Sequence, residues 1–145
     1  MPDKAGTITL AGHLADGKQI EIRIILRRTN ATDRVEAQFQ SEHNLGSDWW
    51  GVDTVPDHVV SILEVRVGKD YVPLPRSSYG DLADVRQASL MVSKEKFKIS
   101  VYGGETGTGY AACLEFDGSN LIGREVSHNE MGLEEKTQYF PVRGN

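Results

Sequence analysis

The chain has 145 residues and a formal net charge of −5, with 39% hydrophobic residues, 26% charged residues and a single cysteine. These values are typical of one globular domain, and they argue against a disordered chain. No apolar run approaches the roughly 20 residues of a membrane-spanning helix, no secretory signal is evident, and one cysteine excludes an intrachain disulfide. The acidic balance argues against nucleic-acid binding, which needs a basic surface. We therefore expect a single cytoplasmic domain over residues 1–145, with neither nucleic acid nor membrane as a partner.

The N-terminal segment predicts a β-hairpin. Apolar and polar residues alternate on both sides of Ala15-Asp16-Gly17-Lys18, and Asp-Gly tolerates the positive φ angles of a tight turn. We predict a two-residue turn at Asp16-Gly17. Gly12 replaces an inward side chain, which suggests a bulge. The apolar residues expected on one face are Ile8, Leu10, Leu14, Ile20, Ile22, Ile24 and Leu26.

The pattern then predicts further strands at residues 34–40 and 59–67. In the first, Val35, Ala37 and Phe39 are expected to face inward, and in the second, Leu63, Val65 and Val67 alternate with charged residues. Gly68-Lys69-Asp70 predicts a turn. The following segment, Tyr71 to Pro75, contains two prolines, which confine it to a sheet edge or a loop.

Residues 78–86 are the one place where a helix competes with a strand. Leu82 and Val85 are three residues apart, but the matching position one turn later is Ser89, so the helical period fits poorly. We predict a single helical turn, followed by a strand with Ala88, Leu90 and Val92 on one face. A helix over residues 78–88 would instead make the domain α+β. After a turn at residues 93–96, Phe97 to Val101 again alternate as a strand.

The glycine-rich stretch "VYGGETGTGY", residues 101–110, resembles a phosphate-binding loop only in composition. Gly104 and Gly109 have the separation of a P-loop, but Tyr110 and Ala111 stand where lysine and a hydroxyl residue are required. Both phosphate motifs also need a helix after the loop, whereas residues 110–116 alternate as a strand. We predict a turn between antiparallel strands that binds no nucleotide, then a hairpin at Asp117-Gly118 into residues 120–126, and a polar tail.

No other motif predicts catalysis or metal binding. His128-Asn129-Glu130 has the H-x-E spacing of zinc deaminases, but the accompanying cysteine pair is absent. Cys113 lies in a predicted strand without a basic neighbour, which favours a small buried residue over a nucleophile. His13 and His58 adjoin apolar residues and are interpreted as scaffold. We therefore expect no catalytic residue, no metal and no cofactor.

The longest break in the strand pattern, residues 41–57, is the best candidate for a binding loop. Its 17 residues include Trp49 and Trp50, the only tryptophans of the chain, next to Asp48. Loops of this length are often functional. Adjacent side chains diverge, so we expect one ring to plug the core and the other to contact a partner. The exposed amides of the glycine-rich loop, with Glu105, Thr106 and Thr108, are a second predicted contact.

Together these patterns predict a mainly β domain, an antiparallel β-sandwich or open barrel of about seven to nine strands with at most one short helix. The expected function is a small acidic module that binds a protein partner, as an immunity protein or an adaptor does. A domain that binds a small ligand or carbohydrate is the first alternative. An enzyme whose site is assembled only in three dimensions is the second.

Overall fold

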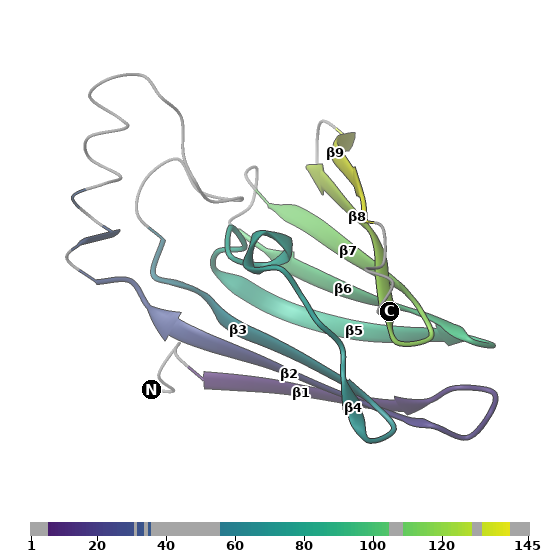
Figure 1. Cartoon of the computed structure of the whole chain (residues 1–145). Helices are drawn as coiled ribbons and strands as arrows, with labels where there is room; N and C mark the ends of the chain where they lie inside the picture. The colour runs from purple at the N-terminus through teal and green to yellow at the C-terminus, as the bar shows by residue number, and fades with distance from the viewer. Residues whose placement is uncertain are drawn as a thin grey trace.

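The computed structural model describes residues 6–30, 32, 33, 35, 56–104, 109–128 and 132–139, and this part of the chain forms two antiparallel sheets (Figure 1). The first sheet has the strand order β1-β2-β3-β4 and the second has the order β5-β6-β7-β8-β9. The elements are β1 (Gly6–His13), β2 (Gln19–Arg28), β3 (His58–Val67), β4 (Asp70–Tyr71), the 3₁₀ helix η1 (Arg76–Ser78), β5 (Val85–Ser93), β6 (Lys96–Gly103), β7 (Tyr110–Asp117), β8 (Asn120–His128) and β9 (Gly132–Gln138). The predicted β-sandwich is confirmed.

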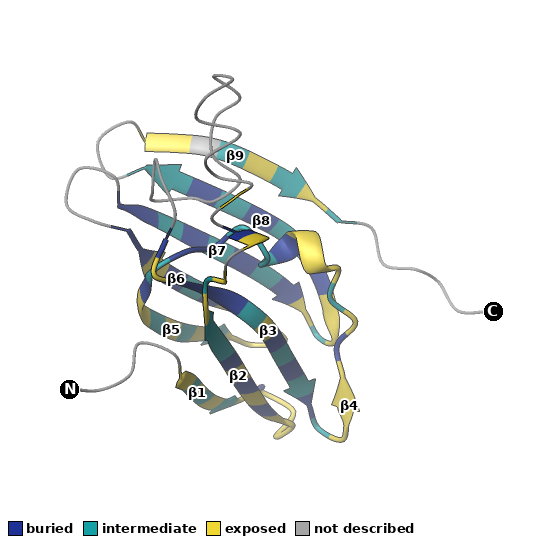
Figure 2. Ribbon diagram, turned by 90° about the vertical axis from the view of Figure 1, so that its left-hand side faces the viewer, coloured by how far each residue is buried: buried dark blue, intermediate teal, exposed yellow. Residues whose placement is uncertain are grey.

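Each strand of a sheet pairs with the next strand along the chain, so both sheets are meanders. The apolar side chains that face the space between the sheets form one core (Figure 2). Its innermost members include Ile22 and Val65 of the first sheet and Ile99 and Leu114 of the second, each fully buried. Phe97 and Phe116 lie on neighbouring strands and their rings stack with centroids 4.6 Å apart. The period-two pattern therefore predicted the buried faces of these strands correctly.

The N-terminal hairpin is confirmed, but its turn differs from the prediction. The N–H of Gly17 donates to the carbonyl oxygen of Leu14 at 2.9 Å, and the N–H of Leu14 donates to Lys18 at the same distance. Ala15 and Asp16 are thus the central residues, and Gly17 follows them with φ +88°. This is a three-residue loop in which glycine takes the left-handed bulge position. The predicted two-residue turn is wrong, because Asp-Gly suits both geometries.

Gly12 does not mark a bulge, since β1 pairs with β2 in continuous register from Gly6–Leu26 to His13–Gln19. A Cβ atom at position 12 would lie 2.9 Å from Cδ2 of Leu90. The glycine therefore allows the two sheets to approach closely at this point.

The prediction of an inward-facing Val35 is also wrong. Val35 is 67% exposed and its backbone is helical. The cause is a reciprocal pair of hydrogen bonds, in which Asn30 N–H donates to Asp33 Oδ2 at 2.8 Å and Asp33 N–H donates to Asn30 Oδ1 at 3.0 Å. Such a pair starts a helix, and here it overrides the alternating pattern. The rest of the predicted strand, Arg34 and residues 36–40, lies outside the described residues.

Two further differences concern short or polar segments. The predicted helical turn occurs as η1, two residues earlier than expected, and β5 begins at Val85, so the α+β alternative is wrong. The predicted polar tail contains β9, which pairs with β8. Its sequence, Gly132-Leu-Glu-Glu-Lys-Thr-Gln138, has no apolar alternation, because an edge strand needs no fully buried face.

Candidate functional site

The residues predicted to contact a partner, namely Asp48, Trp49, Trp50, Glu105, Thr106 and Thr108, lie outside the described residues. The structure does describe the residues on either side of both segments. Pro56 and Asp57 are the last two residues of the 41–57 segment and His58 follows it, whereas Gly103 and Gly104 begin the 103–108 segment. The following contacts show that these flanking residues meet at one end of the sandwich.

Asp84 connects the flanks of the two segments. Its Oδ1 atom accepts hydrogen bonds from the N–H groups of Asp57 at 2.9 Å and His58 at 3.2 Å. Its own N–H donates to the carbonyl oxygen of His58 at 2.9 Å, and its carbonyl oxygen accepts from Gly104 N–H at 3.2 Å. One residue therefore holds the return of the 41–57 segment and the start of the glycine-rich segment together.

Asp84 has an unusual backbone, with φ +46°, in the left-handed region that non-glycine residues seldom occupy. Aspartate is among the residues that tolerate this region, because its short carboxylate bonds to nearby backbone groups. The neighbouring residues are anchored to the first sheet, since Leu82 accepts a 3.1 Å hydrogen bond from Val60 N–H and Ala83 forms an isolated bridge with Val59. These contacts hold the strained residue in place.

His58 packs against Asp84 as part of the same scaffold. The side chain is buried, with Nδ1 3.5 Å from Asp84 Oδ1 and Nε2 3.3 Å from the carbonyl oxygen of Val85. Both ring nitrogens thus face polar atoms of Asp84 and Val85, where β5 begins. The sequence analysis interpreted His58 as scaffold, and in the structure its ring is packed at this end of the sandwich.

Tyr110, the first residue of β7, supports the other side of this end. Its hydroxyl donates to the carbonyl oxygen of Ala83 at 2.8 Å. Burial raises the pKa of Tyr110, so the hydroxyl stays protonated as a donor. Gly103 lies against the Tyr110 hydroxyl and the carbonyl oxygen of Ala83. Glycine is required at this position, because a Cβ atom would be 2.6 Å from the hydroxyl oxygen.

The residue after β2, Thr29, is also bonded to the residues that follow the 36–55 segment. Thr29 N–H donates to the carbonyl oxygen of Asp57 at 3.2 Å, and Thr29 Oγ1 donates to that of Pro56 at 2.7 Å. Close by, Arg27 Nη1 lies 2.9 Å from Asp33 Oδ2. The hydrogen bond from Arg27 lowers the pKa of the Asp33 carboxyl. Thr29, directly after β2, is therefore hydrogen-bonded to the residues that follow the segment with both tryptophans.

From the contacts of Asp84 we predict the order in which three substitutions at this position lower the free energy of unfolding. Asp84→Asn keeps an oxygen acceptor and a residue type that tolerates positive φ, so its free energy of unfolding should stay close to the original. Asp84→Gly loses the acceptor but relieves the backbone, and should cost about 1–2 kcal/mol. Asp84→Ala loses the acceptor and keeps the strain, and should cost about 1 kcal/mol more than glycine. Urea unfolding measures the series, and equal losses for alanine and glycine would contradict the role of φ.

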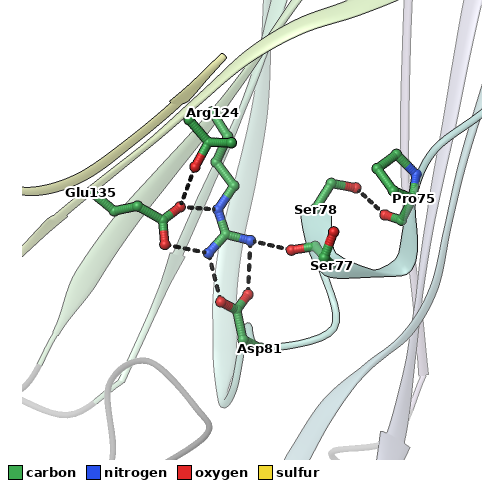
Figure 3. A network of polar contacts seen from close by, with 7 residues as sticks. Pro75, Ser77, Ser78, Asp81, Arg124 and Glu135 are labelled. Carbon is green, nitrogen blue, oxygen red and sulfur yellow. Dashed lines mark hydrogen bonds and ion pairs between the residues drawn. The ribbon is translucent and has the colours of Figure 1, made fainter. Parts of the chain in front are cut away.

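A second polar cluster, which the sequence analysis missed, surrounds Arg124 on β8 (Figure 3). The side chain is 2% exposed. Its Nη1 and Nη2 atoms donate to the two carboxylate oxygens of Asp81 at 2.8 and 2.6 Å, and Nη1 also donates to the carbonyl oxygen of Ser77 at 2.9 Å. On the other side, Nε lies 2.7 Å from Glu135 Oε1. We call these four residues the Arg124 clamp.

The Arg124 clamp joins η1 and the segment after it to β8 and β9 (Figure 3). Burial alone would lower the pKa of Arg124, but the hydrogen bond with Asp81 and the charges of Asp81 and Glu135 outweigh it and raise the pKa. The arginine therefore stays charged and all three of its nitrogens face acceptors. The Arg124 clamp is a structural contact. In the sequence, the only signal that could have indicated it was an arginine at an inward position of an alternating strand.

Cys113, the single cysteine that the sequence analysis considered, lies on β7. Cys113 is half-buried, and burial raises the pKa of its thiol, which disfavours the nucleophilic thiolate. Among the residues that the structure describes, no cluster of three or more histidine, cysteine, aspartate or glutamate side chains is arranged to hold a metal ion. Nor does the same part of the chain contain a helix with the length and apolar character to cross a membrane.

Comparisons with known proteins identify no relative. No family model matches the chain, and neither a curated protein nor a solved structure is significantly similar to it.

Proposed function

We propose that the chain is a protein-binding module whose contact residues lie in the 41–57 and 103–108 segments, at the Asp84 end of the sandwich. The observation that carries this proposal is the double attachment of Asp84, which binds the flanks of both segments. Binding residues commonly lie on loops that a rigid β scaffold positions. Here the two segments with the richest contact chemistry share one such support.

The composition of these segments suggests the chemistry of the partner. Trp49 and Trp50 supply aromatic area, and aromatic residues are enriched among the energetically dominant residues of interfaces. Asp48, Asp53 and Glu105 place three of the chain's acidic residues in or beside these segments, and the whole chain carries −5. Opposite charge speeds association and selects partners. We therefore propose a basic protein surface as the target, as for an immunity protein or an adaptor.

Alanine substitutions at the two tryptophans test this function. One variant should lose about 3–5 kcal/mol of folding free energy, because its ring fills the core. The other should keep its melting temperature and weaken partner binding by tenfold or more, about 1.4 kcal/mol. Thermal unfolding and affinity capture, followed by titration of the captured protein at two salt concentrations, measure both effects.

Met91→Ala is the matched control, since Met91 is a large apolar residue that is 70% exposed on β5, away from the Asp84 contacts. It should change neither the captured protein nor its affinity. If both tryptophan variants unfold the domain, the 41–57 segment only covers the core and the proposal fails. Binding of a glycan or small metabolite without any captured protein would favour the first alternative function.

A further inference from the structure

The side of the sandwich formed by β1 and β5 is less buried than the rest of the core, although the two strands approach closely at Gly12 and Leu90. These strands are the first members of their sheets, so each is an edge strand. Their inward-facing apolar side chains are only partly buried, whereas those of the inner strands β2, β6 and β7 are almost entirely buried (Figure 2). We call this set the open strip, and its members are Ile8, Leu10, Ala88, Leu90 and Val92.

The other edges of the two sheets are protected. β4 has only two residues, which leaves little backbone to pair with another strand. β9 carries glutamates and a lysine, and its pairing with β8 shifts register between Val126 and Ser127. The Arg124 clamp also ties β9 to the segment after η1. Short strands, charges and bulges are the usual devices that prevent pairing at a sheet edge.

β1 has none of these devices. Gly6–His13 contains no charged residue and no proline, and its register with β2 is continuous. Leu14 N–H donates to the carbonyl oxygen of Lys18, so these two residues form a hydrogen-bonded pair. Along antiparallel strands such pairs alternate with pairs that are not hydrogen-bonded, so every second residue of β1 counted back from Leu14 bonds to β2. The backbone N–H and C=O groups of Thr7, Thr9 and Ala11 therefore point away from β2. The side chains of these three residues are exposed as well.

We propose that the β1 edge and the open strip form an interface between two copies of this chain, with β1 of one copy antiparallel to β1 of the other. Directly opposed residues then lie on the same face. A two-fold axis at Thr9 sets Ile8 opposite Leu10 of the second copy, and an axis at Leu10 sets Leu10 opposite itself. In either register, apolar side chains continue the core across the interface, and the outward backbone groups gain partners.

Charge favours a second copy as the occupant. Each chain carries −5, so most pairs of surfaces bring like charges together. Gly6–His13 and residues 87–93 contain no lysine, arginine, aspartate or glutamate. Two acidic copies can therefore approach at this side without repulsion between the paired strands. The interface is separate from the Asp84 end, and the inference does not depend on the proposed partner.

Sedimentation velocity over a range of concentrations, together with amide hydrogen exchange, tests the proposal on the full chain. The weight-average mass should rise toward twice that of one chain with increasing concentration. In the dimer, the amides of Thr9 and Ala11 should exchange at least tenfold more slowly than in dilute protein. The amides of Leu10 and Gly12, which face β2, should change less.

The variant Thr9→Lys/Ala11→Lys places like charges opposite each other in both registers and should remain monomeric. Its control is Ser100→Lys/Tyr102→Lys, which adds the same charges with the same spacing on β6, a strand bonded on both sides. The control should dimerise as the original chain does, and circular dichroism should show both variants folded. A monomer at all concentrations, or a dimer in which the Thr9 and Ala11 amides are not slowed, would overturn the inference.

Discussion

Replacing Arg124 with methionine should lower the free energy of unfolding by about 3 kcal/mol, the largest effect that we expect from a single polar residue. The side chain is 2% exposed and contacts two carboxylates. Without it, Asp81 and Glu135 both lose the guanidinium that they share. Both carboxylates are about one-third exposed, so water can solvate part of their charge. The loss of unfolding free energy should therefore be at the lower end of the range for a broken buried ion pair.

Arg23→Met is the matched control for this substitution. Arg23 also lies on a strand and contacts a carboxylate, with Nη1 3.3 Å from Glu64 Oε2, but both side chains are substantially exposed. Exposed pairs contribute at most about 1 kcal/mol. Urea unfolding compares the two variants. Similar losses at positions 23 and 124 would show that burial of the Arg124 clamp has no energetic consequence.

A triple variant separates the charge of the clamp from its packing. Arg124→Met combined with Asp81→Asn and Glu135→Gln removes the cation and both anions together. Because no uncompensated charge remains, this variant should regain at least half of the stability that Arg124→Met loses. A triple variant as unstable as the single one would indicate that the loss comes from packing rather than from unpaired carboxylates.

Gly103→Ala should also destabilise the fold, by about 2–3 kcal/mol. The added Cβ atom would lie 2.6 Å from the Tyr110 hydroxyl oxygen and 2.7 Å from the carbonyl oxygen of Ala83. These two atoms are hydrogen-bonded to each other, so neither moves without losing the bond. The strain would reach Asp84, the next residue after Ala83, and hence the proposed binding end.

Gly123→Ala is the control, because its Cβ atom would meet its nearest neighbour at 3.7 Å, an ordinary van der Waals distance. It should change the free energy of unfolding by less than about 1 kcal/mol. The double variant Gly103→Ala/Tyr110→Phe lacks the hydroxyl oxygen and its hydrogen bond to Ala83, which frees the ring to shift, but it keeps Cζ at 2.8 Å, so it should recover only a small part of the loss. Thermal or urea unfolding measures all three variants, and equal stability of the two alanine variants would contradict the close approach at Gly103.

The sequence by itself determined the β class and most of the strands. Alternation of apolar and polar residues identified the inner faces of β2, β6 and β7, because one side of each strand must be removed from water wherever the sheets pack. The same rule failed where burial is incomplete or local bonding competes. It missed β9, a polar edge strand, and it placed Val35 in a strand although the Asn30–Asp33 hydrogen bonds begin a helix.

Only the tertiary structure decided the polar contacts that organise the candidate site. Asp84 meets Asp57 and Gly104, which are 27 and 20 positions away in the chain. Arg124 meets Asp81 across 43 positions. A periodic pattern reports which face of an element is apolar, but hydrogen bonds and ion pairs depend on distances of a few ångströms between segments. Those distances exist only after the two sheets have packed. An inward arginine at position 124 was therefore the only local signal, and nothing in the sequence marked Asp84 or named the partners of either residue.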